Sequence, residues 1–270
     1  LEIYIIGIVE GAISYRAGAI AFSFFMALFP FALFILNLIP YIPIEGFQQD
    51  FLKFLEESVP PNTYEAIASI INDILNNSYK GLLSSGFLLS IFLMANGLNA
   101  ILGGFENSHH VILKRGFLSQ YAVALGMSVI LSLLLIVTVA TTVIFEVFIQ
   151  SIKLDNVFNN NIKFIEIGRY GFLMLMILIT SSILLKFGTR ETSNNSFISI
   201  GSVFTTVLII LSSYFFGIWV VKFSKYNELY GSIGTLLIMM FYIWLNCMIL
   251  LLGFELNASI NRLKRRNLFK

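Results

Sequence analysis

The sequence predicts an all-α fold, a polytopic membrane bundle of six transmembrane helices with short amphipathic helices in the first extracytoplasmic loop. Of the 270 residues, 57% are hydrophobic and only 12% are charged, whereas soluble domains carry about 25% charged residues. The mean hydropathy of +0.86 agrees with this composition. Because so few charges cannot cover a globule in water, soluble enzymes and nucleic-acid-binding domains are poor interpretations. The net charge of +2 is also small for a nucleic-acid surface.

Six apolar stretches are long enough to cross a membrane, which takes about 20 mostly apolar residues. They are residues 15–39, 82–104, 117–148, 166–187, 197–221 and 230–256. The third has room for about 45 Å of helix, more than a hydrocarbon core of about 30 Å. We therefore expect that helix to tilt or to project from the membrane. No separate soluble domain is visible, so residues 1–270 are predicted to form a single transmembrane domain.

Residues 40–80 are the only sizeable segment outside these spans, and two amphipathic helices are predicted in it. The first has an apolar stripe that includes Phe47, Phe51 and Phe54. The second follows the break at residues 60–61, with Asn62 as a candidate N-cap. These helices could lie in the outer membrane interface or close over a cavity between spans, and interfacial packing is the favoured interpretation.

The distribution of Lys and Arg predicts the orientation of the chain. Both termini, together with the 105–116 and 186–196 loops, carry ten cations against five carboxylates, whereas the opposite side carries seven against ten. Both termini are therefore expected in the cytoplasm. The C-terminal basic run, RLKRRNLFK, is expected to lie among anionic lipid headgroups. We favour this anchor over an RNA site, because the run is short and follows a span directly.

Polar groups are costly inside a membrane, and four of the polar side chains within the expected spans are singled out. They are the candidate intramembrane polar contacts: Asn96, Asn99, Asn246 and Glu255. For the asparagines, hydrogen bonds between helices are favoured over a solute path. For Glu255, pairing with a cytoplasmic Arg or Lys is favoured over uptake of a proton or cation.

Neither a metal site nor a cofactor site is predicted. The chain has one cysteine and two histidines, too few for a Cys/His zinc cluster. His109 and His110 are neighbours in a short inner loop, and adjacent residues rarely bind one metal together. A solvated loop is therefore the favoured interpretation of both.

Small residues recur at the start of the chain and at the start of the last span. Gly7, Gly11, Ser14 and Gly18 give the first helix one smooth face, which favours close helix packing. The glycines of YGSIGT, at the start of the last span, would let its backbone approach a neighbour. Packing is the favoured meaning of both patterns.

Three segments carry a family resemblance. They are RAGAIAFSFFMALFPFAL at residues 16–33, KFGTRETSNNSFISIGSVFTTVL at residues 186–208, and the closing YNELYGSIGTLLIMMFYIWLNCMILLLGFELNAS at residues 226–259. The chain resembles the BrkB/YihY family of bacterial inner-membrane proteins, many of which carry the label ribonuclease BN, a tRNA-processing ribonuclease. The resemblance implies a multi-pass protein of the bacterial cytoplasmic membrane with six helices. Some family members are linked to serum resistance or to envelope lipid handling.

The function expected from these observations is the transport or handling of a lipid or other amphiphile in the cell envelope, without enzymatic activity. An ion channel, built by a homo-oligomer, or a non-transporting membrane scaffold is the alternative. The ribonuclease label is disfavoured, because the cytoplasmic carboxylates are scattered over different segments and cannot be seen to hold two metals. Membrane lipids are the expected partners, and nucleic acid is not.

Overall fold

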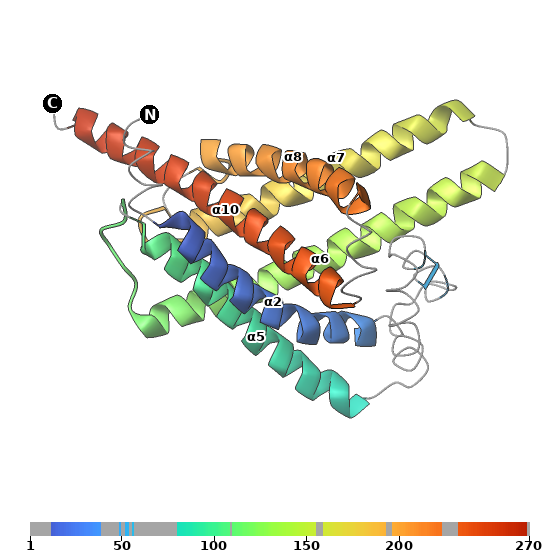
Figure 1. Ribbon diagram of the computed structural model, residues 1–270, viewed down its shortest axis with the longest axis horizontal. Coiled ribbons are helices and arrows are strands. Elements are labelled where there is room, and N and C mark those ends of the chain that lie inside the picture. Colours follow the sequence, from blue (N-terminus) through green and yellow to red (C-terminus); the bar gives the residue numbers. More distant parts are fainter. Residues whose placement is uncertain are drawn as a thin grey trace. The chain divides into compact units, whose positions relative to one another are not determined.

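The residues that the computed structural model describes contain six long helices (Figure 1). It describes residues 12–38, 49, 52–53, 56, 80–108, 110–154, 159–192, 196–222 and 232–268. The helices are α2 (Ile13–Leu38), α5 (Lys80–Glu106), α6 (Phe117–Leu154), α7 (Asn159–Phe187), α8 (Ile200–Lys222) and α10 (Ser232–Leu268). No strand occurs in these residues, so the all-α prediction is confirmed.

The helices agree with the predicted spans at their centres and differ at their ends. Helices α6, α7 and α10 extend beyond the predicted spans 117–148, 166–187 and 230–256, because α6 continues to Leu154, α7 begins at Asn159 and α10 continues to Leu268. Hydropathy reports where apolar residues stop, whereas the backbone hydrogen bonds of a helix continue into polar sequence. The fifth predicted span, 197–221, starts too early: the Ser199 hydroxyl accepts a hydrogen bond from the Ser202 N–H (3.1 Å) and caps α8.

Four stretches of the described residues are long and apolar enough to cross a membrane: Phe117–Phe145, Ile167–Phe187, Ile200–Val220 and Leu236–Lys264. Helices α2 and α5 contribute shorter apolar stretches, Ile13–Leu28 and Ile91–Glu106. The count of six spans therefore stays a prediction. The amphipathic segment at 40–80 lies outside the described residues except for positions 49, 52, 53, 56 and 80, and its two helices stay predictions as well.

The chain forms two compact units. Unit 1 contains residues 1–27, 94–128 and 177–270, and unit 2 contains residues 28–93 and 129–176. Unit 1 therefore holds the first half of α2, the second half of α5, the start of α6, the end of α7, and all of α8 and α10. The single transmembrane domain stays a prediction.

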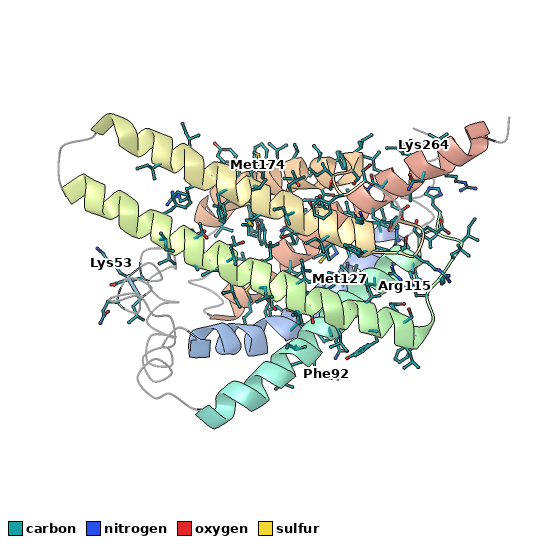
Figure 2. All side chains as sticks on the ribbon, turned by 180° about the vertical axis from the view of Figure 1, so that it is seen from behind. Lys53, Phe92, Arg115, Met127, Met174 and Lys264 are labelled. Carbon is teal, nitrogen blue, oxygen red and sulfur yellow. The ribbon has the colours of Figure 1, made fainter. Side chains whose placement is uncertain are left out.

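In unit 2, two threonine hydroxyls are satisfied within their own helix, and large apolar side chains are exposed. The hydroxyls of Thr138 and Thr142 donate to the carbonyls one turn earlier, each at 2.7 Å. Phe145 packs on Phe172 with ring centroids 6.2 Å apart. Phe92 and Met174 are half-exposed (Figure 2). A helix surface of this kind is suited to lipid.

In unit 1, the first two turns of helix α8 bury small and polar residues, and the helix exposes large apolar residues along its length. The buried residues are Gly201, Ser202, Thr205 and Thr206. The exposed residues are Ile200, Val203, Val207, Leu211, Tyr214, Phe215, Ile218 and Trp219. Water would favour the reverse arrangement. Small residues at the helix contact and large apolar residues outside are the pattern of helices packed in a membrane.

Helices α8 and α10 approach each other at two glycines. A Cβ atom on Gly253 would collide with the Thr205 Oγ1 atom and would lie 2.9 Å from the Gly201 carbonyl oxygen. A Cβ atom on Gly201 would collide with the Gly253 carbonyl oxygen. Gly18, in contrast, has no atom of the described residues within 4 Å of an added Cβ. The close packing predicted for the first helix is therefore wrong at Gly18, and Gly7 and Gly11 lie outside the described residues.

Candidate functional site

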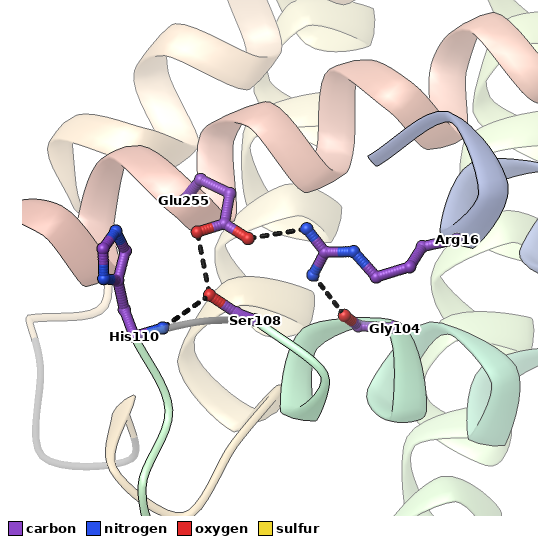
Figure 3. A network of polar contacts seen from close by, with 5 residues as sticks. All are labelled: Arg16, Gly104, Ser108, His110 and Glu255. Atoms are coloured by element: carbon purple, nitrogen blue, oxygen red, sulfur yellow. Dashed lines mark hydrogen bonds and ion pairs between the residues drawn. The ribbon is translucent and has the colours of Figure 1, made fainter. Parts of the chain in front are cut away.

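An ion pair buried in unit 1 joins helices that are far apart in the sequence (Figure 3). The Arg16 Nη2 atom lies 2.7 Å from the Glu255 Oε1 atom, and the two side chains are 9% and 0% exposed. Through Nη1, Arg16 also donates to the Gly104 carbonyl at 2.7 Å. That carbonyl is among the last four of α5, which have no partner within their own helix. One guanidinium therefore holds α2, α5 and α10 together.

The second oxygen of Glu255 continues this network. The Ser108 hydroxyl donates to Glu255 Oε2 at 2.8 Å and accepts from the His110 backbone N–H at 3.2 Å (Figure 3). The His110 Nδ1 atom lies 3.0 Å from the Arg262 Nη1 atom. Because a guanidinium can only donate, Nδ1 accepts and the imidazole is not doubly protonated in this contact. We call Arg16, Ser108, His110, Glu255 and Arg262 the polar junction.

The favoured pairing of Glu255 with an arginine is present, whereas the solvated loop predicted for His110 is wrong. His110 is buried, because α10 continues far enough to place Arg262 against its ring. His109 lies outside the described residues. The arrangement satisfies both oxygens of the buried carboxylate, which is the condition for keeping a charge away from water.

Two aromatic rings next to the ion pair set the register of α5 and α10. Phe105 stacks on Phe254 with centroids 4.4 Å apart and an interplanar angle of 12°. Both rings are fully buried. Phe105 follows Gly104 in the sequence and Phe254 precedes Glu255, so each ring adjoins a residue that Arg16 contacts. Gly188 leaves room for this stack, since a Cβ atom there would lie 2.5 Å from Phe105 Cδ2.

Two loops at the same end of unit 1 are hydrogen-bonded to each other. The Glu191 Oε1 atom accepts from the Ile112 and Leu113 backbone N–H groups at 2.9 and 2.8 Å. Arg115 donates through Nη1 to the Phe187 and Gly188 carbonyls at 3.0 and 3.1 Å, and so caps the end of α7. Residues 107–116 are therefore held against residues 187–191.

Replacing Glu191 with Ala should release residues 107–116, because two backbone N–H groups lose their acceptor. The expected cost is about 1 kcal/mol, since both bonds are exposed and water can replace the carboxylate. Limited proteolysis of purified protein should show faster cleavage between residues 107 and 116. Glu56→Ala, at an exposed glutamate in unit 2, is the control, and equal cleavage of both variants would contradict the prediction.

Asn257 connects the start of α8 to α10. Its Oδ1 atom accepts from the Gly201 N–H at 2.8 Å, and its Nδ2 atom donates to the Ser199 hydroxyl at 2.8 Å. It therefore serves as a capping residue supplied by another helix. Asn257 and Gly253 lie one turn apart and both face α8, whereas Glu255 between them contacts α2 and residue 108.

In the described part of the chain, each of the four predicted site residues has different hydrogen-bond partners. Asn96 accepts from the Tyr121 hydroxyl at 3.0 Å, and Asn99 accepts from the Gln120 side chain at 2.9 Å. Both bonds join α5 to α6, as favoured from the sequence. Within the described residues, Asn246 instead donates at 2.8 Å to a carbonyl of its own helix, that of Tyr242. A solute path along these residues stays a prediction.

Sequence reasoning missed the specific roles of Arg16, Ser108, His110 and Asn257. Arg16 was counted only for its charge, although an arginine four residues inside an apolar helix is itself a signal for a buried partner. The contact of Asn257 with Gly201 also had a signal in the sequence. Gly201 precedes Thr205 by one turn in a small-xxx-small pattern, which indicates close packing of another helix. Ser108 and His110 had none. No group of three or more His, Cys, Asp or Glu residues in the described segments is arranged to hold a metal.

Comparison with known proteins assigns the family. Residues 7–269 match the family model described as virulence factor BrkB. The chain belongs to the BrkB family. The match confirms the resemblance and covers every residue of the polar junction, so the ion pair lies within the family domain.

Relatives of this BrkB-family chain are similar over most of their length. A Bacillus subtilis (strain 168) protein named ribonuclease-like protein YfkH is 28% identical over 93% of this chain and 90% of its own. UPF0761 membrane proteins of Coxiella burnetii strains are 23% identical over 90% of this chain and 86% of their own. No solved structure matches. The family and the apolar helices together identify a membrane protein.

Proposed function

We propose that this BrkB-family protein is a six-span protein of the bacterial inner membrane that transports or handles a lipid or another amphiphile. The observation that carries the proposal is the distribution of side chains in the helices. Large apolar residues of α8 face outward, whereas hydroxyl, amide and ionic groups lie inside unit 1. An amphiphile needs both environments, an apolar one for its tail and a polar one for its headgroup.

The polar contacts of unit 1 support six spans that alternate in direction. Helices α2, α6 and α8 begin at the end of the unit where α5 and α7 end, and α10 reaches this end with its C-terminal half. Arg16 joins the start of α2 to the end of α5, Arg115 joins residues before α6 to the end of α7, and Asn257 joins α10 to the start of α8. This is the arrangement that six alternating spans require.

Reporter fusions test the topology. We expect cytoplasmic reporters to be active at the C-terminus and within residues 107–116 and 188–196, since ten of the 17 cations lie on this side. A periplasmic reporter should be active within residues 40–80. Termini in opposite compartments would contradict both the six spans and the predicted orientation.

Lipid transport is tested with the purified protein in liposomes that contain a fluorescent phospholipid. We expect the wild type to accelerate its exchange between leaflets. Asn99→Ala should slow exchange roughly tenfold, the effect of about 1.4 kcal/mol. If Asn99 serves only to join α5 to α6, the variant should lose about 0.6 kcal/mol of stability and should exchange lipid as fast as the wild type. Gly217→Ala is the control, because no atom of the described residues lies within 4 Å of an added Cβ there.

A measurement of ion flux on the same liposomes separates a channel from a lipid carrier. Rapid ion flux without lipid exchange would favour the channel, and neither activity would favour a scaffold. Either result would overturn the proposed lipid transport.

We further propose that the protein is not an enzyme, although one relative is named ribonuclease-like. At the proposed cytoplasmic end, the three glutamates that the structure describes accept hydrogen bonds from structural partners, which supports this view. Glu106 accepts from the Arg115 backbone N–H at 3.1 Å, Glu191 from two loop N–H groups, and Glu255 from Arg16 and Ser108. RNA cleavage by purified protein that is lost in Glu106→Gln or His109→Ala would contradict it.

A further inference from the structure

Exposed apolar side chains gather where residues 107–116 lead into α6. Ile112, Phe117 and Leu118 are 79%, 75% and 81% exposed, and Leu113 is also exposed. These residues belong to a loop and to the first turn of a helix, at the end of unit 1 that carries the polar junction. In contact with water alone, such a group would be unfavourable.

Cationic residues lie beside these apolar residues. Lys114 and Arg190 are exposed, and the bonds of Glu191 to the Ile112 and Leu113 N–H groups hold the two loops together. Phe187, at the end of α7, adds an exposed ring next to them. We call Ile112, Lys114, Phe117, Leu118, Phe187 and Arg190 the interfacial rim.

The charge around the rim is positive and is not neutralised by its own carboxylates. Residues 105–116 and 186–192 contain four cations, Lys114, Arg115, Lys186 and Arg190, and two glutamates, Glu106 and Glu191, which gives a net charge of +2. Burial lowers the pKa of Arg115, the Glu106 carboxylate opposes this, and the positive charge of Arg190 lowers the pKa further. The two guanidinium groups therefore repel each other, and an anion beside them would relieve that repulsion.

We propose that the interfacial rim binds the phosphate-bearing headgroups of anionic phospholipids in the inner leaflet. Ile112, Phe117 and Leu118 enter the acyl-chain boundary, while Lys114 and Arg190 lie at the level of the phosphates. The choice of leaflet rests on the proposed topology, whereas the preference for anionic lipid rests on the charges alone. A zwitterionic lipid carries no net charge and gains little from these cations.

The test is titration of the purified full-length protein in detergent with phosphatidylglycerol and with phosphatidylcholine, followed by native mass spectrometry. The wild type should bind phosphatidylglycerol more tightly. Lys114→Gln with Arg190→Gln should weaken phosphatidylglycerol binding about 30-fold, from two headgroup charges, and leave phosphatidylcholine unchanged. Ile112→Ser with Leu118→Ser should weaken both lipids equally.

The matched control removes one lysine and one arginine in unit 2, by Lys53→Gln with Arg169→Gln. The inference is overturned if the wild type binds both lipids equally, or if this control loses as much affinity as the rim variant. The outcome is separate from that of the proposed function. If the protein exchanges lipid in liposomes but binds both lipids equally, only the proposed binding by the interfacial rim is overturned. If it prefers phosphatidylglycerol but does not exchange lipid, only the proposed transport is overturned.

Discussion

Arg16→Met should destabilise the protein by about 3–5 kcal/mol, because it leaves the Glu255 carboxylate buried without a cation. Glu255 is fully buried and Arg16 nearly so, and their atoms are 2.7 Å apart. The variant also removes the donor to the Gly104 carbonyl at the end of α5. The loss should exceed that of an exposed ion pair, which is worth about 0–1 kcal/mol. Thermal unfolding in detergent, followed by fluorescence-detected size exclusion, measures it.

Two further variants separate the ion pair from the general effect of removing an arginine. Lys264→Met, at an exposed cation of α10, is the control and should leave the stability unchanged. Arg16→Met combined with Glu255→Met should be more stable than Arg16→Met alone, since no buried charge remains, with a coupling energy of about 2 kcal/mol. A loss below about 1 kcal/mol in Arg16→Met would show that Glu255 reaches water or another cation in the membrane.

The fold was predictable because it depends on local patterns of apolar residues. Each expected span overlaps one helix, and errors occur where polar sequence continues a helix, as in α10 beyond residue 256. A hydropathy pattern reports the solvent around a segment, whereas hydrogen bonding within the helix decides its ends. The cap at Ser199 illustrates this, because a hydroxyl and not a change in hydropathy begins α8.

The polar junction was predictable only in part, because its contacts join residues far apart in the sequence. A partner for Glu255 was expected from the cost of burying a carboxylate, but Arg16 is 239 positions away and one of several possible cations. His110 was misjudged for a similar reason, since Arg262 reaches it across 152 positions. Residue type indicates the need for a partner, and only packing selects it.

The closing motif that suggested the family has a physical meaning in each of its three distinctive residues. Gly253 lets α8 approach, Glu255 pairs with Arg16, and Asn257 caps α8. Their spacing places Gly253 and Asn257 on one face of α10 and Glu255 on another. One helix therefore contacts α8 with one face and α2 with the other, and a substitution at either face should affect a different neighbour.

Gly253→Ala tests the contact with α8 and should destabilise the protein by on the order of 3 kcal/mol, the range of overpacked cores. The added methyl group would collide with Thr205 Oγ1 and would lie 2.9 Å from the Gly201 carbonyl oxygen, which cannot rotate away. Gly217→Ala is the matched control on α8, where no atom of the described segments lies within 4 Å of an added Cβ. That variant should keep or gain stability, by up to about 1 kcal/mol of helix propensity.

A second substitution identifies the atoms responsible. Thr205 Oγ1 is buried and has no hydrogen-bond partner among the described residues, so Thr205→Ala alone should cost little. Combined with Gly253→Ala, it removes the nearest colliding atom and should restore part of the lost stability, while the Gly201 carbonyl oxygen remains close. Equal stability of Gly253→Ala and Gly217→Ala, measured by thermal unfolding in detergent, would contradict the close approach of α8 and α10. Because the Asn257 cap depends on the same approach, Gly253→Ala should also weaken the protection of the Gly201 N–H from hydrogen exchange.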